Sequence, residues 1–143
     1  MTQRDELVRD FFGALDAGDL DRLAEMLTPD CAFAAPGFSG RGPDAATGWL
    51  RVFINACPDV AHEILTVADA GDTVGVEIRV RGTHTAPLQG PGGDIPPTGR
   101  PFDIHAADIW RMEGDRIATY HIYFDQMAFL GQLGLLPEPA ATA

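Results

Sequence analysis

The sequence predicts an α+β domain in which helices pack against one face of a curved antiparallel sheet. Apolar residues recur at helical spacing as far as Pro58, and from Ala61 onward the spacing changes to two, which is typical of strands. The chain of 143 residues is 45% hydrophobic, enough for one sizeable core, and contains no internal repeat. We therefore expect a single domain over residues 1–143, with a frayed tail at 137–143.

Two helices are expected at the start of the chain. Thr2 and Asp5 have the spacing of a capping box, and the helix that they begin runs to Gly18. Asp19 can cap a second, short helix that Pro29 stops. The apolar stripes of these helices consist of Leu7, Val8, Phe11, Phe12, Leu15, Leu20, Leu23, Ala24 and Leu27.

A third helix follows two short segments. Residues 31–34 are briefly apolar and residues 36–42 are rich in turn formers. Pro43 suits the first turn of a helix, and Pro58 limits how far that helix extends. Its apolar stripe consists of Ala46, Trp49, Leu50 and Phe53.

Alternating apolar residues indicate strands in the second half of the chain. Within residues 73–84 the even positions are mostly apolar, and residues 102–112 and 116–124 form a hairpin. Residues 85–101 hold five prolines and four glycines, which predicts a long loop of the kind that often covers a site. Asp125, which lies near the end of the sheet, can cap a closing helix.

Composition excludes several function classes. Acidic residues number 21 against 10 basic ones, all of them arginine, and the net charge is −11. Such a surface repels phosphate backbones and anionic lipid, so we expect no nucleic-acid or membrane partner, and instead a hydrophobic small molecule. A chain without lysine has no Schiff-base or P-loop chemistry. Because no metal-ligand spacing or nucleotide motif is present either, we expect no metal and no cofactor.

The cysteines and the N-terminal residues indicate the compartment. Cys31 and Cys57 lie beside apolar residues without C-x-x-C spacing, which predicts buried free thiols. The first ten residues are too polar for a signal peptide, and no apolar run approaches the roughly 18 residues of a membrane span. We therefore expect a cytoplasmic protein.

Asp108 is the most informative position for chemistry. The even positions of residues 102–112 are otherwise apolar, so a single carboxyl group interrupts a face that should point into the core. Burial disfavours the ionised form of a carboxyl group. Asp108 therefore either has a dedicated hydrogen-bond partner in a structural role or has a raised pKa that suits acid or base catalysis.

Three more polar residues are candidates for catalysis. His84 ends an apolar strand face where the long loop begins, so it either lies at the pocket mouth or has a structural role. Tyr120 and His121 lie on opposite faces of one strand. Tyr120 is the better inward donor to a substrate oxygen. His121 would be a proton shuttle if its own face pointed inward, and a surface or interface residue if it did not. His105 is expected outside the cavity.

An apolar cavity between helices and sheet is the natural ligand site. Its walls should come from large apolar side chains, although such residues are more often plain core. The candidates are Phe11, Phe33, Phe38, Trp49 and Phe53, together with Ile122 and Phe124 on the face of Tyr120.

Four motifs carry a resemblance to a known family. They are GTHT at 82–85, PPTGR at 96–100, DIWR at 108–111 with GDRI at 114–117, and FLGQLG at 129–134. Over nearly the whole chain they resemble the SnoaL-like polyketide cyclases of the nuclear transport factor 2-like superfamily. The resemblance implies a cone-shaped arrangement of N-terminal helices and curved sheet around an apolar pocket, and a homodimer.

The resemblance also implies site residues. In these cyclases an aspartate on the last strand is the acid and base that acts on a polyketide enol, helped by a histidine on the strand before. When the turn motif is laid on residues 111–117, the aspartate position holds Ile122 and the histidine position holds Asp108. The family's cyclisation then requires that Asp108 has taken over the carboxylate role, with Tyr120 or His84 assisting. Related epoxide hydrolases would have an arginine where this chain has Ala106, which disfavours that reaction.

We therefore expect a cofactor-independent acid/base enzyme of cyclase, isomerase or dehydratase type. Its substrate would be a hydrophobic, polyketide-like molecule of secondary metabolism, such as antibiotic biosynthesis. The missing cyclase aspartate favours a second hypothesis, a non-catalytic binding module or an accessory protein of an oxygenase. A third, a purely structural dimerisation domain, predicts a pocket filled by its own side chains. The sequence does not identify the substrate, the regiochemistry or the oligomer size.

Overall fold

A computed structural model of the chain describes residues 2–136. The expected frayed tail at 137–143 lies outside the described residues. In chain order the elements are α1 (Gln3–Asp16), α2 (Leu20–Glu25), β1 (Leu27–Ala35), β2 (Phe38–Arg41), α3 (Pro43–Ala56), β3 (Ala61–Asp69), β4 (Thr73–Thr83), β5 (Leu88–Gly90), β6 (Gly93–Ile95), β7 (Pro101–Glu113), β8 (Arg116–Phe124) and α4 (Gln126–Gln132).

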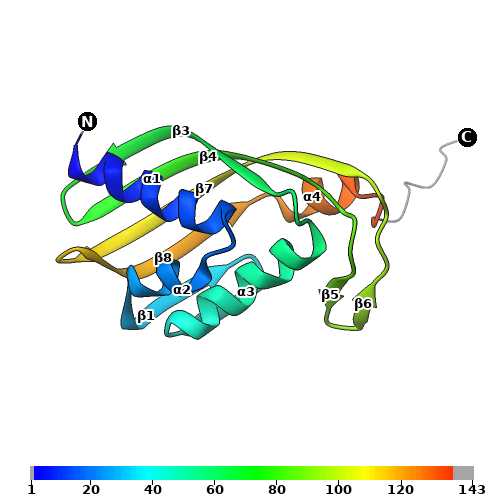
Figure 1. Ribbon diagram of the computed structural model, residues 1–143, viewed down its shortest axis with the longest axis horizontal. Coiled ribbons are helices and arrows are strands. Elements are labelled where there is room, and N and C mark those ends of the chain that lie inside the picture. Colours follow the sequence, from blue (N-terminus) through cyan, green and yellow to red (C-terminus); the bar gives the residue numbers. More distant parts are fainter. Residues whose placement is uncertain (1, 137–143) are drawn as a thin grey trace, which may run out of the picture.

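Six strands form one curled sheet in the order β2-β1-β8-β7-β4-β3. Figure 1 shows α1, α2 and α3 lying together over one side of this sheet, with α4 at its far end. The predicted α+β architecture is therefore confirmed. Neighbouring strands are antiparallel except β1 and β8, which pair in parallel. The sequence did not predict this pair, because its strands lie at opposite ends of the chain and no short turn joins them.

Local signals explain where α1 begins and which side it buries. The Thr2 hydroxyl accepts a hydrogen bond from the backbone N–H of Asp5 at 3.1 Å, and the Asp5 carboxylate accepts one from the Thr2 N–H at 3.0 Å. This reciprocal pair is the predicted capping box. The residues of α1 that are buried are Val8, Phe11, Phe12, Ala14 and Leu15, so the helical stripe faces the sheet.

The second helix is shorter than the spacing of apolar residues predicts. It ends at Glu25, and Leu27 already belongs to β1, which continues through Pro29. The prediction that Pro29 stops a helix was wrong. The register between β1 and β8 shifts between Leu27 and Ala32, and a proline without an N–H is tolerated at such an irregularity in a ladder.

Two segments predicted as turn or loop contain short strands. β2 lies within the turn-rich stretch at 36–42 and pairs with β1. The long loop contains the β5–β6 hairpin, which extends past the end of α3 in Figure 1. Gly93, with φ +114°, begins the returning strand in a conformation that other residues rarely adopt. The strands β2, β5 and β6 are only three or four residues long, too short for a period of two to stand out.

The core follows the alternation that the sequence predicts. Val74, Val76 and Ile78 of β4 are buried. Cys31 and Cys57 are free and buried, as expected, and burial raises the pKa of each thiol to about 11. Within residues 2–136 no helix has both the length and the apolar character needed to cross a bilayer.

Candidate active site

A cavity lies between the helices and the concave face of the sheet. It contains about 630 Å³ of empty space including its mouth, of which about 80 Å³ can be reached by the centre of a water molecule. Its walls are predominantly apolar, with Leu50 from α3, and Ile78 and Ile104 from the sheet. Asp108, Tyr120 and His62 are the titratable side chains among the described residues that line it. Such a chamber suits an apolar guest that meets a few polar groups.

Asp108 lies on β7 with its side chain inside this cavity. It is 1% exposed, and the Trp110 Nε1–H donates a hydrogen bond to its Oδ2 at 3.3 Å. Burial raises the pKa of Asp108 to about 7, and the hydrogen bond from Trp110 opposes this rise. The carboxyl group therefore exists in both protonation states near neutral pH, so it can donate or accept a proton.

Tyr120 is the second inward polar group that the sequence predicted. It lies on β8 opposite Trp110 and is 1% exposed. Burial raises the pKa of Tyr120 well above its usual value, and the nearby Asp108 carboxyl adds to this effect. The phenol therefore keeps its proton and remains a hydrogen-bond donor.

Ile122 occupies the position that the resemblance assigns to the cyclase aspartate. It is the cross-strand partner of Asp108, and both side chains line the cavity. Directly opposite residues in an antiparallel pair have Cβ atoms about 5 Å apart. The carboxyl group thus lies one strand away from that position, at the same level of the sheet.

The predicted wall residues fall into two groups. Trp49, Phe53, Ile122 and Phe124 line the cavity. Phe11 and Phe33 are buried but do not line it, because they pack around the Tyr120 ring at centroid distances of 5.3 and 5.1 Å. Phe38 on β2 is 43% exposed and does not line it either.

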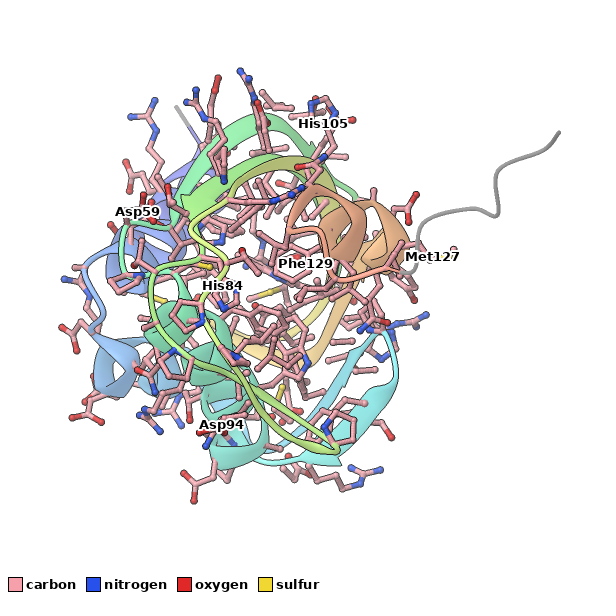
Figure 2. The ribbon with its side chains drawn as sticks, turned by 90° about the vertical axis from the view of Figure 1, so that its right-hand side faces the viewer. Asp59, His84, Asp94, His105, Met127 and Phe129 are labelled. Carbon is pink, nitrogen blue, oxygen red and sulfur yellow. The ribbon has the colours of Figure 1, made fainter. Side chains whose placement is uncertain are left out.

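The structure does not bring His84 to Asp108. His84 is fully buried at the base of the long loop, where its Nδ1 accepts the Thr98 N–H at 3.2 Å. Its backbone also pairs with the far end of this loop, since its N–H donates to the Arg100 carbonyl at 3.0 Å. Figure 2 shows His84 well inside the molecule beneath this loop. His84 is not among the residues that line the cavity.

His121 lies outside the cavity for a different reason. Because side chains alternate along β8, the inward position of Tyr120 turns its neighbour to the outer face. There the His121 Nδ1 lies 3.4 Å from the Tyr123 hydroxyl. His105 is also exposed, as expected, and Figure 2 shows it at the outer edge of the molecule.

One polar pair at the cavity was not predicted from the sequence. His62 on β3 lines the cavity, and its Nδ1 lies 2.6 Å from Oδ1 of Asp16 at the end of α1. These residues are 46 positions apart, so no local motif joins them. The sequence nevertheless held a signal for His62. It lies two residues before the apolar Ile64, so the alternation of a strand places both side chains on the inner face.

Comparison with known proteins identifies the family. A family model described as the SnoaL-like domain matches residues 8–120, which is most of the chain. The chain belongs to the SnoaL-like domain family. No protein of curated function matches this SnoaL-like protein by sequence.

Solved structures show the same fold over nearly the full length. A proposed SnoaL-like polyketide cyclase from Jannaschia sp. CCS1 is 22% identical with a TM-score of 0.82, and 94% of each chain is covered. AclR, a proposed hydroxylase from Streptomyces galilaeus, is 21% identical with a TM-score of 0.80, covering 94% of this chain and 98% of its own. IdmH, a proposed polyketide cyclase from Streptomyces antibioticus, is 26% identical with a TM-score of 0.77, and the match covers 93% of this chain and 99% of IdmH. The fold is thus the nuclear transport factor 2-like or ketosteroid isomerase-like fold.

Proposed function

We propose that the protein is a cofactor-independent acid/base enzyme that acts on a hydrophobic, polyketide-like small molecule. The observation that carries this proposal is one carboxyl group, that of Asp108, which is 1% exposed in an apolar cavity and has a pKa raised to about 7. Two of the structural neighbours are proposed polyketide cyclases, which supports a polyketide-like substrate. A cytoplasmic location stays a prediction from the sequence.

The geometry supports a different chemical role for each of the two buried polar residues. Above pH 7 the Asp108 carboxylate can remove a proton from an acidic carbon of the substrate, and the resulting acid can return the proton elsewhere. The Tyr120 hydroxyl, which keeps its proton, can donate a hydrogen bond to the oxygen where negative charge develops. The apolar walls exclude water and strengthen both interactions. Such proton transfers serve cyclisation, isomerisation and dehydration alike.

A carbon acid that reports its own deprotonation tests this proposal without the natural substrate. The probe 5-nitrobenzisoxazole opens to a coloured phenolate when a base removes its ring proton. We expect turnover to rise with pH through about 7, where Asp108 becomes a carboxylate. Asp108→Asn should lower kcat by about 10²- to 10⁴-fold with KM little changed. Equal turnover by wild type and variant would remove Asp108 from the mechanism.

The second candidate function is a binding module without turnover, such as an accessory protein of an oxygenase. Ile122 favours it, because an apolar side chain lines the cavity where the resemblance places the cyclase aspartate. Aromatic polyketide intermediates distinguish the two functions: binding with no product would favour the module. The open space beside Asp108 argues against the third hypothesis, a pocket filled by its own side chains.

We also propose a homodimer, as the resemblance implies. The outer face of the sheet is not covered by α1, α2 or α3 (Figure 1), and it carries Tyr123, which is 56% exposed. Light scattering after size exclusion should give twice the monomer mass. A monomer at micromolar concentration would refute the dimer.

A further inference from the structure

His62 and Asp16 form the closest polar contact at the cavity. Besides the 2.6 Å contact between His62 Nδ1 and Asp16 Oδ1, the backbone N–H of His62 donates to Asp16 Oδ2 at 3.1 Å. Both carboxylate oxygens thus contact one residue. The side chain of His62 is 11% exposed and that of Asp16 is 32% exposed. The pair therefore lies nearer to solvent than Asp108.

This arrangement fixes the chemistry of the imidazole ring. A carboxylate only accepts hydrogen bonds, so Nδ1 carries the hydrogen that points to Asp16. In the neutral ring Nε2 is then left as an acceptor. Within residues 2–136, Nε2 of His62 has no hydrogen-bond partner, and the ring lines the cavity. A ligand that brings a hydroxyl group can supply this partner.

Asp16 occupies a position that its helix disfavours. It is the last residue of α1, where the helix dipole is negative and a carboxylate is destabilising. Such a departure from local preference is typical of functional sites.

His62 and Asp108 lie at two separate places in one cavity. The Phe12 ring packs against the His62 ring at 5.5 Å and against the Trp110 ring at 6.2 Å, and Trp110 donates to Asp108. His62 is paired with Val80 of β4 and Asp108 with Val76, so their levels differ by about 13 Å along the strand direction. An apolar stretch thus separates the two polar groups.

We propose that His62, held by Asp16, is a second polar contact of the substrate site and binds a hydroxyl or enol oxygen through Nε2. Its substrate is then an elongated apolar molecule with one reactive centre at Asp108 and an oxygen function at the opposite end. Asp16 is a positioning residue that acts through His62. The inference rests on the proposed function in one respect only, that the cavity is the substrate site.

Two probes of the same shape test this inference. The probe 2,6-dihydroxynaphthalene has a hydroxyl group at each end, and naphthalene has none. We expect His62→Asn, whose amide nitrogen replaces Nδ1 but not Nε2, to keep the contact with Asp16. It should weaken binding of the diol about three- to tenfold, the value of one hydrogen bond, and leave naphthalene affinity unchanged. His62→Gln, whose amide reaches the place of Nε2, should restore part of the loss.

Further readouts exclude a merely structural role. The exposed His105→Asn is the matched control and should change neither affinity. The ¹⁵N resonance of Nε2 should shift when the diol binds and stay in place with naphthalene. Equal loss of both affinities, no loss of either, or a wild type that does not prefer the diol would overturn the inference. Turnover of 5-nitrobenzisoxazole by Asp108→Asn, measured separately, shows whether the proposed function fails on its own.

Discussion

At the scale of single residues, the proposed chemistry depends on where one carboxyl group lies. A period of two along 102–112 predicted that Asp108 points inward, and the same rule favoured Tyr120 over His121. The contact between His62 and Asp16 was beyond such rules, because it depends on how α1 crosses β3. His84 shows the same limit. The alternation along its strand predicts which face carries the side chain, but it does not predict the loop that folds over it.

Replacement of Asp108 should change how stability depends on pH. The pKa of Asp108 is about 7 in the folded protein and near 3.8 in the unfolded chain, so between these values the folded state holds the extra proton. Stability therefore falls as pH rises from about 4 to about 7, by about 4 kcal/mol in total. Asp108→Asn should lose this dependence and be more stable than wild type at pH 8. Urea denaturation at pH 4, 6 and 8 measures the free energy of unfolding of both proteins. If that free energy changed with pH by the same amount in wild type and variant, this prediction would be contradicted.

Replacement of Trp110 should raise the pKa of Asp108 further. The indole N–H stabilises the carboxylate, and Trp110→Phe removes this donor while keeping an aromatic ring. The rise of 5-nitrobenzisoxazole turnover should then move to higher pH. Trp49→Phe, which makes the same change at a residue that lines the cavity, is the control. An unchanged profile in Trp110→Phe would show that the hydrogen bond does not act on the carboxyl group.

At the scale of elements, caps and long periodic segments could be predicted from the sequence and short strands could not. The capping box of α1 and the long strands β4, β7 and β8 agree with the patterns that predicted them. β2, β5 and β6 span three or four residues each, so pairing with neighbours decides their conformation. Pairing with β8 likewise overrides the helical spacing that ended at Leu27.

The cap of α4 should matter to the cavity as well as to stability. The Asp125 carboxylate accepts the Ala128 N–H at 2.9 Å, and α4 contributes Phe129 to the cavity wall. Figure 2 shows Phe129 pointing toward the middle of the molecule. Asp125→Ala should cost about 1 kcal/mol in urea denaturation and weaken naphthalene binding. Asp115→Ala, in the exposed turn after β7, should do neither, and equal effects of the two variants would contradict this role.

At the scale of the whole molecule, the net charge of −11 opposes the compact state. The ion pairs of Arg79 with Asp103 and of Arg81 with Glu63 lie on the exposed side of the sheet. Added salt screens the repulsion between exposed carboxylates. The thermal midpoint should therefore rise between 10 mM and 200 mM sodium chloride at pH 8. A midpoint that falls over this range would show that attraction between opposite charges dominates.

The titration of Asp108 measures the property on which the proposed mechanism depends. Carboxyl ¹³C NMR, with the resonance assigned by its absence in Asp108→Asn, follows this group without any substrate. We expect a midpoint near pH 7, well above the ordinary value of 3.8, because the group is buried in an apolar cavity. A midpoint near 4 would mean that water reaches the carboxyl group, and it would contradict the role proposed for Asp108.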